Sequence, residues 1–236
     1  MEAGGAHDLV YKELESLRVP ETSPPDLCHK GKWLSLLSMK FKSRDGQDSV
    51  WDFCVRTRKL DLMNSDPGKH PSSFVDGTSI IPIIRRKDGK KDIVLVAEYR
   101  IPVGGRVLGF PGGLKDFGES AELCAMRELQ EETGYTMDRC IREALPDIVS
   151  FVDPWKSNEC ENVVIAEIDG EHADNINPKQ ELEAEEDITV LIVPNLGPNT
   201  LDQAAAICQK YGMHMSSDLR RFLLGIKYLR DRKSVV

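Results

Sequence analysis

Residues 112–135 read GGLKDFGESAELCAMRELQEETGY, and this stretch decides the fold. Ser120 is a favoured N-cap residue and Gly134 is favoured just past a helix end, so the sequence predicts a helix from Ala121 to Thr133. Small and apolar side chains recur at helical spacing and predict a buried stripe, formed by Ala121, Cys124, Ala125 and Leu129 with Leu123 and Met126 beside them. A loop, a helix and a second loop therefore lie near the middle of the chain.

Three glutamates of this helix indicate a cation-binding face. Glu131 and Glu132 follow Glu128 by three and four residues, so the three carboxylates share one side of the helix. Like charges at this spacing destabilise a helix by about 0.2–0.5 kcal/mol per pair. Such a face needs either full solvation or a bound cation, and carboxylate oxygens are ligands that Mg²⁺ prefers.

Composition excludes several classes of protein. The chain has 236 residues, 40% of them hydrophobic and 30% charged, with a net charge of -8. Because nucleic acids and anionic membranes are themselves negative, we expect neither as a partner. The six cysteines form no C-x-x-C pair, and no signal peptide is recognisable, so we expect reduced thiols in a protein of the cytoplasm or nucleus.

Two hairpins are predicted ahead of the helix. Between residues 31 and 59, two β-rich runs flank the turn sequence Asp45-Gly46. Residues 78–84 and 93–98 are apolar, β-branched runs, and residues 87–90 between them contain a second Asp-Gly turn. Both hairpins precede the acidic helix.

The chain divides into three predicted parts. Residues 1–28 form a flexible tail, residues 29–70 a small N-terminal antiparallel β-sheet, and residues 71–236 the main domain. Further strands are expected at 147–152, 162–168 and 188–193, and further helices at 201–211 and 217–230. Strands on both sides of an internal helix, with helices at the end, predict an α/β sandwich.

The glycines, Glu119 and Arg127 also stand at fixed offsets, and residues 113–135 follow the pattern G-x5-E-x7-R-E-U-x-E-E-x-G-U. With this residue pattern, the chain resembles the Nudix hydrolases. The resemblance implies an α/β/α sandwich with a mixed sheet, and a box that holds Mg²⁺, or Mn²⁺ in its place, against a diphosphate. It makes Arg127 and Glu119 the residues that orient the helix. The implied metal ligands are Glu128, Glu131, Glu132 and the carbonyl of Gly112.

Flanking residues 30–194 resemble the ADP-sugar pyrophosphatase branch of that family. There a pair of aromatics from a small N-terminal sheet stacks on the adenine, one from each subunit of a homodimer. The matching residues are Trp33 and Trp51, with Asp52 beside the second. The alternative, that both tryptophans are ordinary sheet hydrophobes, stays open.

The same resemblance assigns residues to the diphosphate and to proton transfer. Arg56 and Arg100 match arginines that contact the diphosphate, which suits a guanidinium fork. The general base comes from an acidic loop ahead of the last strand, within residues 181–187. By position this is Glu186, with Glu185 as the alternative.

Two residues depart from the branch. Gly109 stands where a glutamate is common, and Trp155 stands where a glycine is common. The expected activity is metal-dependent hydrolysis of ADP-ribose and related ADP-sugars to AMP and a sugar 5-phosphate. Two alternatives are a diphosphatase for oxidised purine nucleotides such as 8-oxo-dGDP and a nucleotide-binding regulator with little catalysis.

Overall fold

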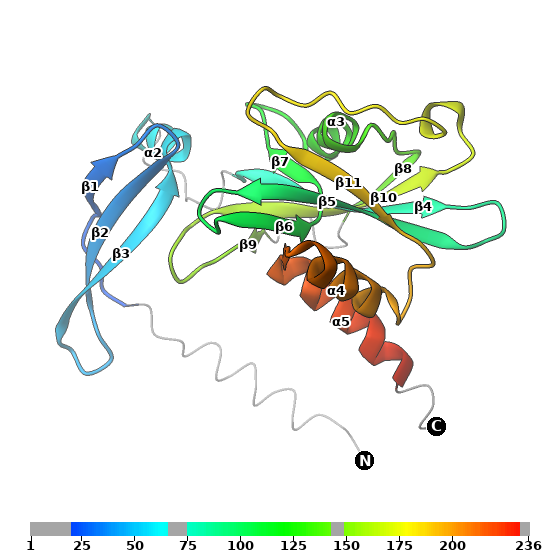
Figure 1. Ribbon diagram of the computed structural model, residues 1–236. Coiled ribbons are helices and arrows are strands. Elements are labelled where there is room, and N and C mark those ends of the chain that lie inside the picture. The colour runs from blue at the N-terminus through cyan, green and yellow to red at the C-terminus, as the bar shows by residue number, and fades with distance from the viewer. Residues whose placement is uncertain (1–19, 66–74, 143–148, 232–236) are drawn as a thin grey trace, which may run out of the picture. The chain divides into compact units, whose positions relative to one another are not determined.

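The computed structural model describes residues 20–65, 75–142 and 149–231. The chain forms two compact units (Figure 1). The small unit is Met1–Pro71 with Asp153–Glu159, and the large unit is Ser72–Val152 with Cys160–Val236. Most of the expected tail, residues 1–19, lies outside the described residues.

The small unit is a three-stranded antiparallel sheet followed by a helix. Its elements are β1 (Asp26–Lys30), β2 (Leu34–Lys42), β3 (Asp48–Arg56) and α2 (Thr57–Ser65), with the strands in the order β1-β2-β3. The turn between β2 and β3 contains Gly46 at φ 82°, as the Asp-Gly signal predicted. The expectation of a flexible tail up to residue 28 is wrong for its last residues. Residues 26–28 belong to β1, which pairs with β2, and the Ser23 N–H donates to the Lys40 carbonyl at 2.9 Å.

One face of this sheet carries the small unit's core. Leu37 and Val55 are buried against Leu60 of α2. Farther along the sheet, a mainly apolar groove of about 280 Å³ is lined by Met39, Phe41, Trp51 and Phe53 together with Pro20 and Thr22. The Asp153–Glu159 segment runs beside β3, where the Cys54 N–H donates to the Lys156 carbonyl at 2.8 Å.

The large unit is built on a nine-stranded mixed sheet. Its strands are β4 (Gly77–Arg85), β5 (Lys91–Arg100), β6 (Gly105–Gly109), β7 (Gly112–Leu114), β8 (Arg139–Arg142), β9 (Ser150–Phe151), β10 (Cys160–Asp169), β11 (Ile188–Val193) and β12 (His214–Met215). The main order is β12-β6-β5-β4-β10-β8, while β11 pairs with β5, β7 with β4 and β9 with β10. The β4–β10 and β6–β12 pairs are parallel and the other pairs antiparallel.

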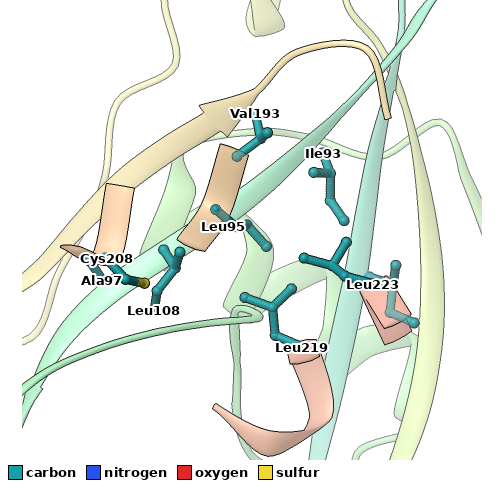
Figure 2. Packing of buried hydrophobic residues seen from close by; sticks show 10 residues of the cluster. Ile93, Leu95, Ala97, Leu108, Val193, Cys208, Leu219 and Leu223 are labelled. Carbon is teal, nitrogen blue, oxygen red and sulfur yellow. The ribbon is translucent and has the colours of Figure 1, made fainter. Parts of the chain in front are cut away.

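Helices cover both faces of this sheet. Figure 1 shows α3 (Ala121–Thr133) on one side and α4 (Thr200–Tyr211) with α5 (Ser217–Asp231) on the other. Alternate residues of β5 serve the two layers: Val94 packs with Leu129 of α3, whereas Leu95 packs toward Leu219 and Leu223 (Figure 2). The predicted α/β/α sandwich is confirmed. A short 3-10 helix, η2 (Ala173–Asn175), follows β10.

The structure adds strands that the sequence pattern did not predict. The Gly- and Pro-rich passage before the acidic helix contains β6 and β7, although such composition disfavours strands. The pairing of β7 with β4 explains the glycine: a Cβ on Gly112 would lie 2.3 Å from the Thr78 carbonyl oxygen, so only glycine allows the two strands to pair. No helix among the described residues is long and apolar enough to cross a bilayer.

A carboxylate-rich candidate active site

The caps predicted from the sequence set both ends of α3. The Ser120 hydroxyl accepts the Leu123 N–H at 3.1 Å. Gly134 adopts the left-handed conformation at φ 74° and donates its N–H to the Gln130 carbonyl at 2.8 Å. The helix therefore begins at Ala121 and ends at Thr133, as predicted, and this phase turns Glu128 and Glu132 toward the sheet.

Glu128 and Glu132 are buried, which is rare for glutamates. Glu132 accepts the Gly112 N–H at 2.9 Å through Oε2. Burial nevertheless raises the pKa of Glu132 to about 8, because the lost hydration outweighs that hydrogen bond. Burial also raises the pKa of Glu128, against the opposing effect of Arg127.

Gly113 allows this burial. A Cβ at Gly113 would lie 2.3 Å from Glu128 Oε1, inside any allowed contact. The Glu128 carboxylate therefore occupies the space that a side chain at residue 113 would fill. The glycine of the motif thus has a steric reason in addition to a conformational one.

Arg127 joins the carboxylates of the motif. Its Nε and Nη2 bind the two oxygens of Glu119 at 3.1 and 3.0 Å, and Nη2 also donates to the Leu114 carbonyl at 3.0 Å. Its Nη1 donates to Glu128 at 2.8 Å and to Glu131 at 3.0 Å. The guanidinium lowers the pKa of Glu119, and Glu119 in turn raises the pKa of Arg127.

The donors suit a hard divalent cation. Glu128, Glu131 and Glu132 supply carboxylate oxygens and Gly112 a carbonyl oxygen, the ligand types that Mg²⁺ takes. In the conformers of this structure Glu128 and Glu131 bind Arg127 instead, and within the described ranges no three acidic, histidine or cysteine side chains gather in an ion-holding geometry. Loading a cation therefore requires these two side chains to turn. A cation bound there would offset the loss of hydration that disfavours the ionised form of Glu132.

Glu98 is a fourth carboxylate of this face that the sequence reasoning missed. It follows Val94 and Val96 on the α3 side of β5, and its side chain is 18% exposed. Burial raises its pKa, and its charge contributes to the raised pKa of Glu132. An acid at the end of the apolar run IVLVAE was the available signal. Arg100, expected on the diphosphate, binds this Glu98 at 2.6 Å.

The two candidate bases differ in burial. Glu186 is half-buried and Glu185 exposed. Beyond the effect of burial, the charge of Glu186 raises the pKa values of the acids near α3, namely Glu98, Glu128 and Glu132. The Glu186 carboxylate accepts the Glu183 N–H at 2.8 Å within its own turn.

The two tryptophans lie apart on the small sheet. Trp33 and Trp51 are 64% and 50% exposed. Trp51 pairs with Met39, whereas Trp33 precedes Leu34, and the strand from Leu34 to Met39 is about 17 Å long. The two tryptophans are therefore not neighbours in the register of the sheet. Asp52, next to Trp51, is also exposed.

Arg56 is held by a residue that no local pattern indicated. It binds Glu159 Oε1 through Nε at 2.9 Å and through Nη2. About three quarters of each side chain is buried. The pair lies within the small unit, since Glu159 ends the Asp153–Glu159 segment.

The two departures also have structural consequences. A Cβ at Gly109 would lie 3.1 Å from the Ser216 hydroxyl, so Ser216 restricts the space for a larger side chain there. Trp155 belongs to the small unit, and its carbonyl accepts the Trp51 indole N–H at 2.9 Å. Its own ring is largely exposed beside Lys156.

The sandwich, with its loop–helix–loop of carboxylates and arginine, defines a hydrolase acting on phosphoric anhydrides. Residues 75–194 match the family described as NUDIX domain, and the chain belongs to this family.

Relatives agree with this assignment. The ADP-ribose pyrophosphatase of Saccharomyces cerevisiae is 36% identical over 176 residues, covering 74% of this chain and 67% of the yeast protein. The ADP-sugar pyrophosphatase of Mus musculus is 32% identical over 174 residues, covering 70% of this chain and 72% of the mouse protein. The crystal structure of an ADP compounds hydrolase superposes with a TM-score of 0.59 at 17% identity, covering 92% of this chain and 97% of that one, which shows a common fold.

Proposed function

We propose that the protein hydrolyses the diphosphate of ADP-ribose and related ADP-sugars to AMP and a sugar 5-phosphate, with Mg²⁺ or Mn²⁺ as cofactor. The observation that carries the proposal is the buried pair Glu128 and Glu132 on the helix of the Nudix motif. Burying two ionised carboxylates without a cation costs folding free energy. The same two carboxylates bind a divalent cation strongly. The names of the yeast and mouse relatives support the substrate class.

Each residue then has a distinct task. Glu128, Glu131 and Glu132 would hold the cation with the Gly112 carbonyl, and the cation, when bound, polarises the phosphoryl oxygens. Glu186 takes a proton from the attacking water. The water oxygen bonds to phosphorus while the phosphoanhydride bond breaks. One product phosphate leaves with the bridging oxygen.

Substrate recognition draws on the remaining residues. Trp33 of one subunit and Trp51 of the other stack on the adenine in a homodimer, which agrees with their separation in one chain. Arg56 and Arg100 contact the diphosphate and exchange their glutamate partners for phosphate oxygens. Both arginines thus have a neutralised charge before substrate arrives.

Product analysis tests the proposal. Purified protein incubated with ADP-ribose and Mg²⁺ should release AMP, and chelation of the metal should stop the release. Glu132→Gln should fold and lose most of the activity, because it removes a ligand charge at nearly constant shape. An absence of AMP at micromolar enzyme would contradict the proposal, and faster turnover of 8-oxo-dGDP at matched concentration would replace its substrate.

A further inference from the structure

The acidic loop at residues 181–187 is fixed to α3 at its start. Gln180 donates through Nε2 to the Glu132 carbonyl at 2.6 Å and to the Ile188 carbonyl at 3.1 Å. The Glu181 N–H donates to the Glu131 carbonyl at 2.8 Å. The first residues of the loop are therefore bound to the last turn of the helix that carries the candidate metal ligands.

An arginine outside the Nudix motif fixes the other end. Arg106 of β6 binds Asp187 Oδ2 through Nη2 at 2.5 Å. Its Nη1 donates to the Asp187 carbonyl at 3.1 Å and to the Ala97 carbonyl at 3.2 Å. Two hydrogen bonds to Asp187 and a third that holds the same planar group on β5 define the position of Asp187 more narrowly than one ion pair would.

The register of the sheet explains how Arg106 reaches Asp187. Glu98 of β5 pairs with Val107 of β6 and with Ile188 of β11. Arg106 and Asp187 each precede these partners, so they flank β5 on opposite edges. The guanidinium therefore crosses the β5 backbone at the Ala97 carbonyl and ties β6 to the first residue before β11.

Glu186 lies between these fixed points. The residue after it is held by Arg106, and its own carboxylate closes a turn with the Glu183 N–H. A general base must lie within about one hydrogen bond of the water that it deprotonates. A backbone held at the adjacent residue is a direct way to set that distance.

We propose that Arg106 is a positioning residue: by holding Asp187 it places Glu186 for proton transfer. This inference rests on the proposed function, in which Glu186 is the base. Arg106 itself touches no reacting atom. A misplaced base slows the chemical step, and displacements near 1 Å can cost about a hundredfold.

The first experiment separates catalysis from binding. Arg106→Gln should lower kcat for ADP-ribose by about tenfold to a hundredfold and change KM less than about threefold. Arg106→Lys keeps the charge but cannot bind Asp187 and Ala97 together. Its kcat should therefore lie between those of the wild type and Arg106→Gln. The matched control is Arg86→Gln, which breaks the 2.6 Å pair with Asp92 at the other end of β5 and should leave kcat unchanged.

A double-mutant cycle tests whether the effect passes through Glu186. In a Glu186→Gln background, Arg106→Gln should lower kcat by less than about threefold further. Equal factors in both backgrounds would show that Arg106 acts elsewhere and would overturn the inference. Full activity of Glu186→Gln would also overturn it, since no base would then need placing.

Hydrogen exchange gives a readout that needs no activity. Amides of residues 181–187 should exchange faster in Arg106→Gln and Asp187→Asn than in the wild type or in Arg86→Gln. Unchanged exchange in both variants would refute the positioning role of Arg106 even if the protein hydrolyses ADP-ribose. Conversely, if these variants exchange faster but the protein releases no AMP, the contact of Arg106 with the loop is confirmed and the proposed function is refuted.

Discussion

Arg56 and Glu159 form a largely buried ion pair in which Nε and Nη2 of the guanidinium bind the same carboxylate oxygen. The two residues are 103 positions apart in the sequence. Glu159 thus occupies the donor edge that the proposed function assigns to a substrate diphosphate. Substrate binding has to compete with an internal anion.

Glu159→Gln should therefore strengthen substrate binding. Without the competing charge, Arg56 is free to bind phosphate, so KM for ADP-ribose should fall by about threefold to tenfold at low ionic strength, which corresponds to about 0.7–1.4 kcal/mol. Arg56→Gln should raise KM. Steady-state kinetics of both variants, with Asp61→Asn at the exposed Lys30–Asp61 pair as control, give the answer. A higher KM in Glu159→Gln would mean that the glutamate orients Arg56 productively.

Replacing either glycine of the loop by alanine should have a different outcome at each position. Gly113→Ala places a Cβ against the flexible Glu128 carboxylate, so the fold should survive while Glu128 is displaced. Gly112→Ala meets the rigid Thr78 backbone at φ 151° and should lower the free energy of unfolding by about 2–4 kcal/mol. Thermal melts with and without Mg²⁺ distinguish them: Gly113→Ala should keep its metal-free Tm but lose the increase on adding metal.

Local signals predicted α3 completely, because its caps are adjacent in sequence to the helix they end. Ser120 and Gly134 each bind backbone within four residues. The strand at Ile188–Val193 was likewise predicted with its exact bounds, since its apolar run is bounded by an acidic stretch and a proline. Such features need no knowledge of the remaining chain.

Long-range partners could not be predicted in the same way. Arg106 and Asp187 meet only because β5 pairs with both β6 and β11. Asp187 belongs to the acidic stretch noted in the sequence, but nothing local to it indicates Arg106 as its partner. The Asp153–Glu159 segment joins the small unit for a similar reason, through backbone bonds beside β3 that any sequence can make. Glu98 differs, because an acid ending a buried apolar strand is visible in the sequence.

Arg127→Lys should damage stability and catalysis together. Lysine keeps the charge but cannot bind Glu119 through two parallel bonds while also reaching Glu128 and Leu114. The free energy of unfolding should fall by about 2 kcal/mol and kcat by more than about tenfold. Denaturant unfolding and kinetics test this, with Arg85→Lys at the exposed Asp138 pair as a control expected to change stability by less than about 0.5 kcal/mol. Equal effects of the two substitutions would contradict the role of Arg127.

Glu132 should make metal-free stability depend on pH. Its pKa is raised by burial from 4.5 to about 8, so between these values the folded state keeps a proton that the unfolded state has lost. The free energy of unfolding therefore falls as pH rises through this window, by up to about 1.4 kcal/mol per pH unit. In chelator, the slope should be steepest in the wild type and shallower in Glu132→Gln, where only the raised pKa values of Glu98 and Glu128 still contribute. Glu171→Gln, in the turn after β10, should behave as wild type.

Excess Mg²⁺ should flatten the same slope, because the cation replaces the proton on the buried carboxyl. The rise in Tm on adding Mg²⁺ should consequently be larger at pH 8 than at pH 6. A metal effect that is equal at both pH values would show that Glu132 does not bind the ion. A slope that is as steep in Glu132→Gln as in the wild type would assign the titration to other groups.

Mixing two tryptophan variants, each with weakened substrate binding, tests whether the adenine site is shared between subunits. Trp33→Ala and Trp51→Ala should each raise KM for ADP-ribose, since stacking on one base is worth about 1–3 kcal/mol. When each adenine site takes Trp33 from one subunit and Trp51 from the other, as proposed, each site of a mixed dimer has either both tryptophans or neither. Equimolar mixing with subunit exchange should therefore restore about a quarter of the wild-type sites. Activity that stays at the mean of the two variants would show that each subunit binds its adenine alone.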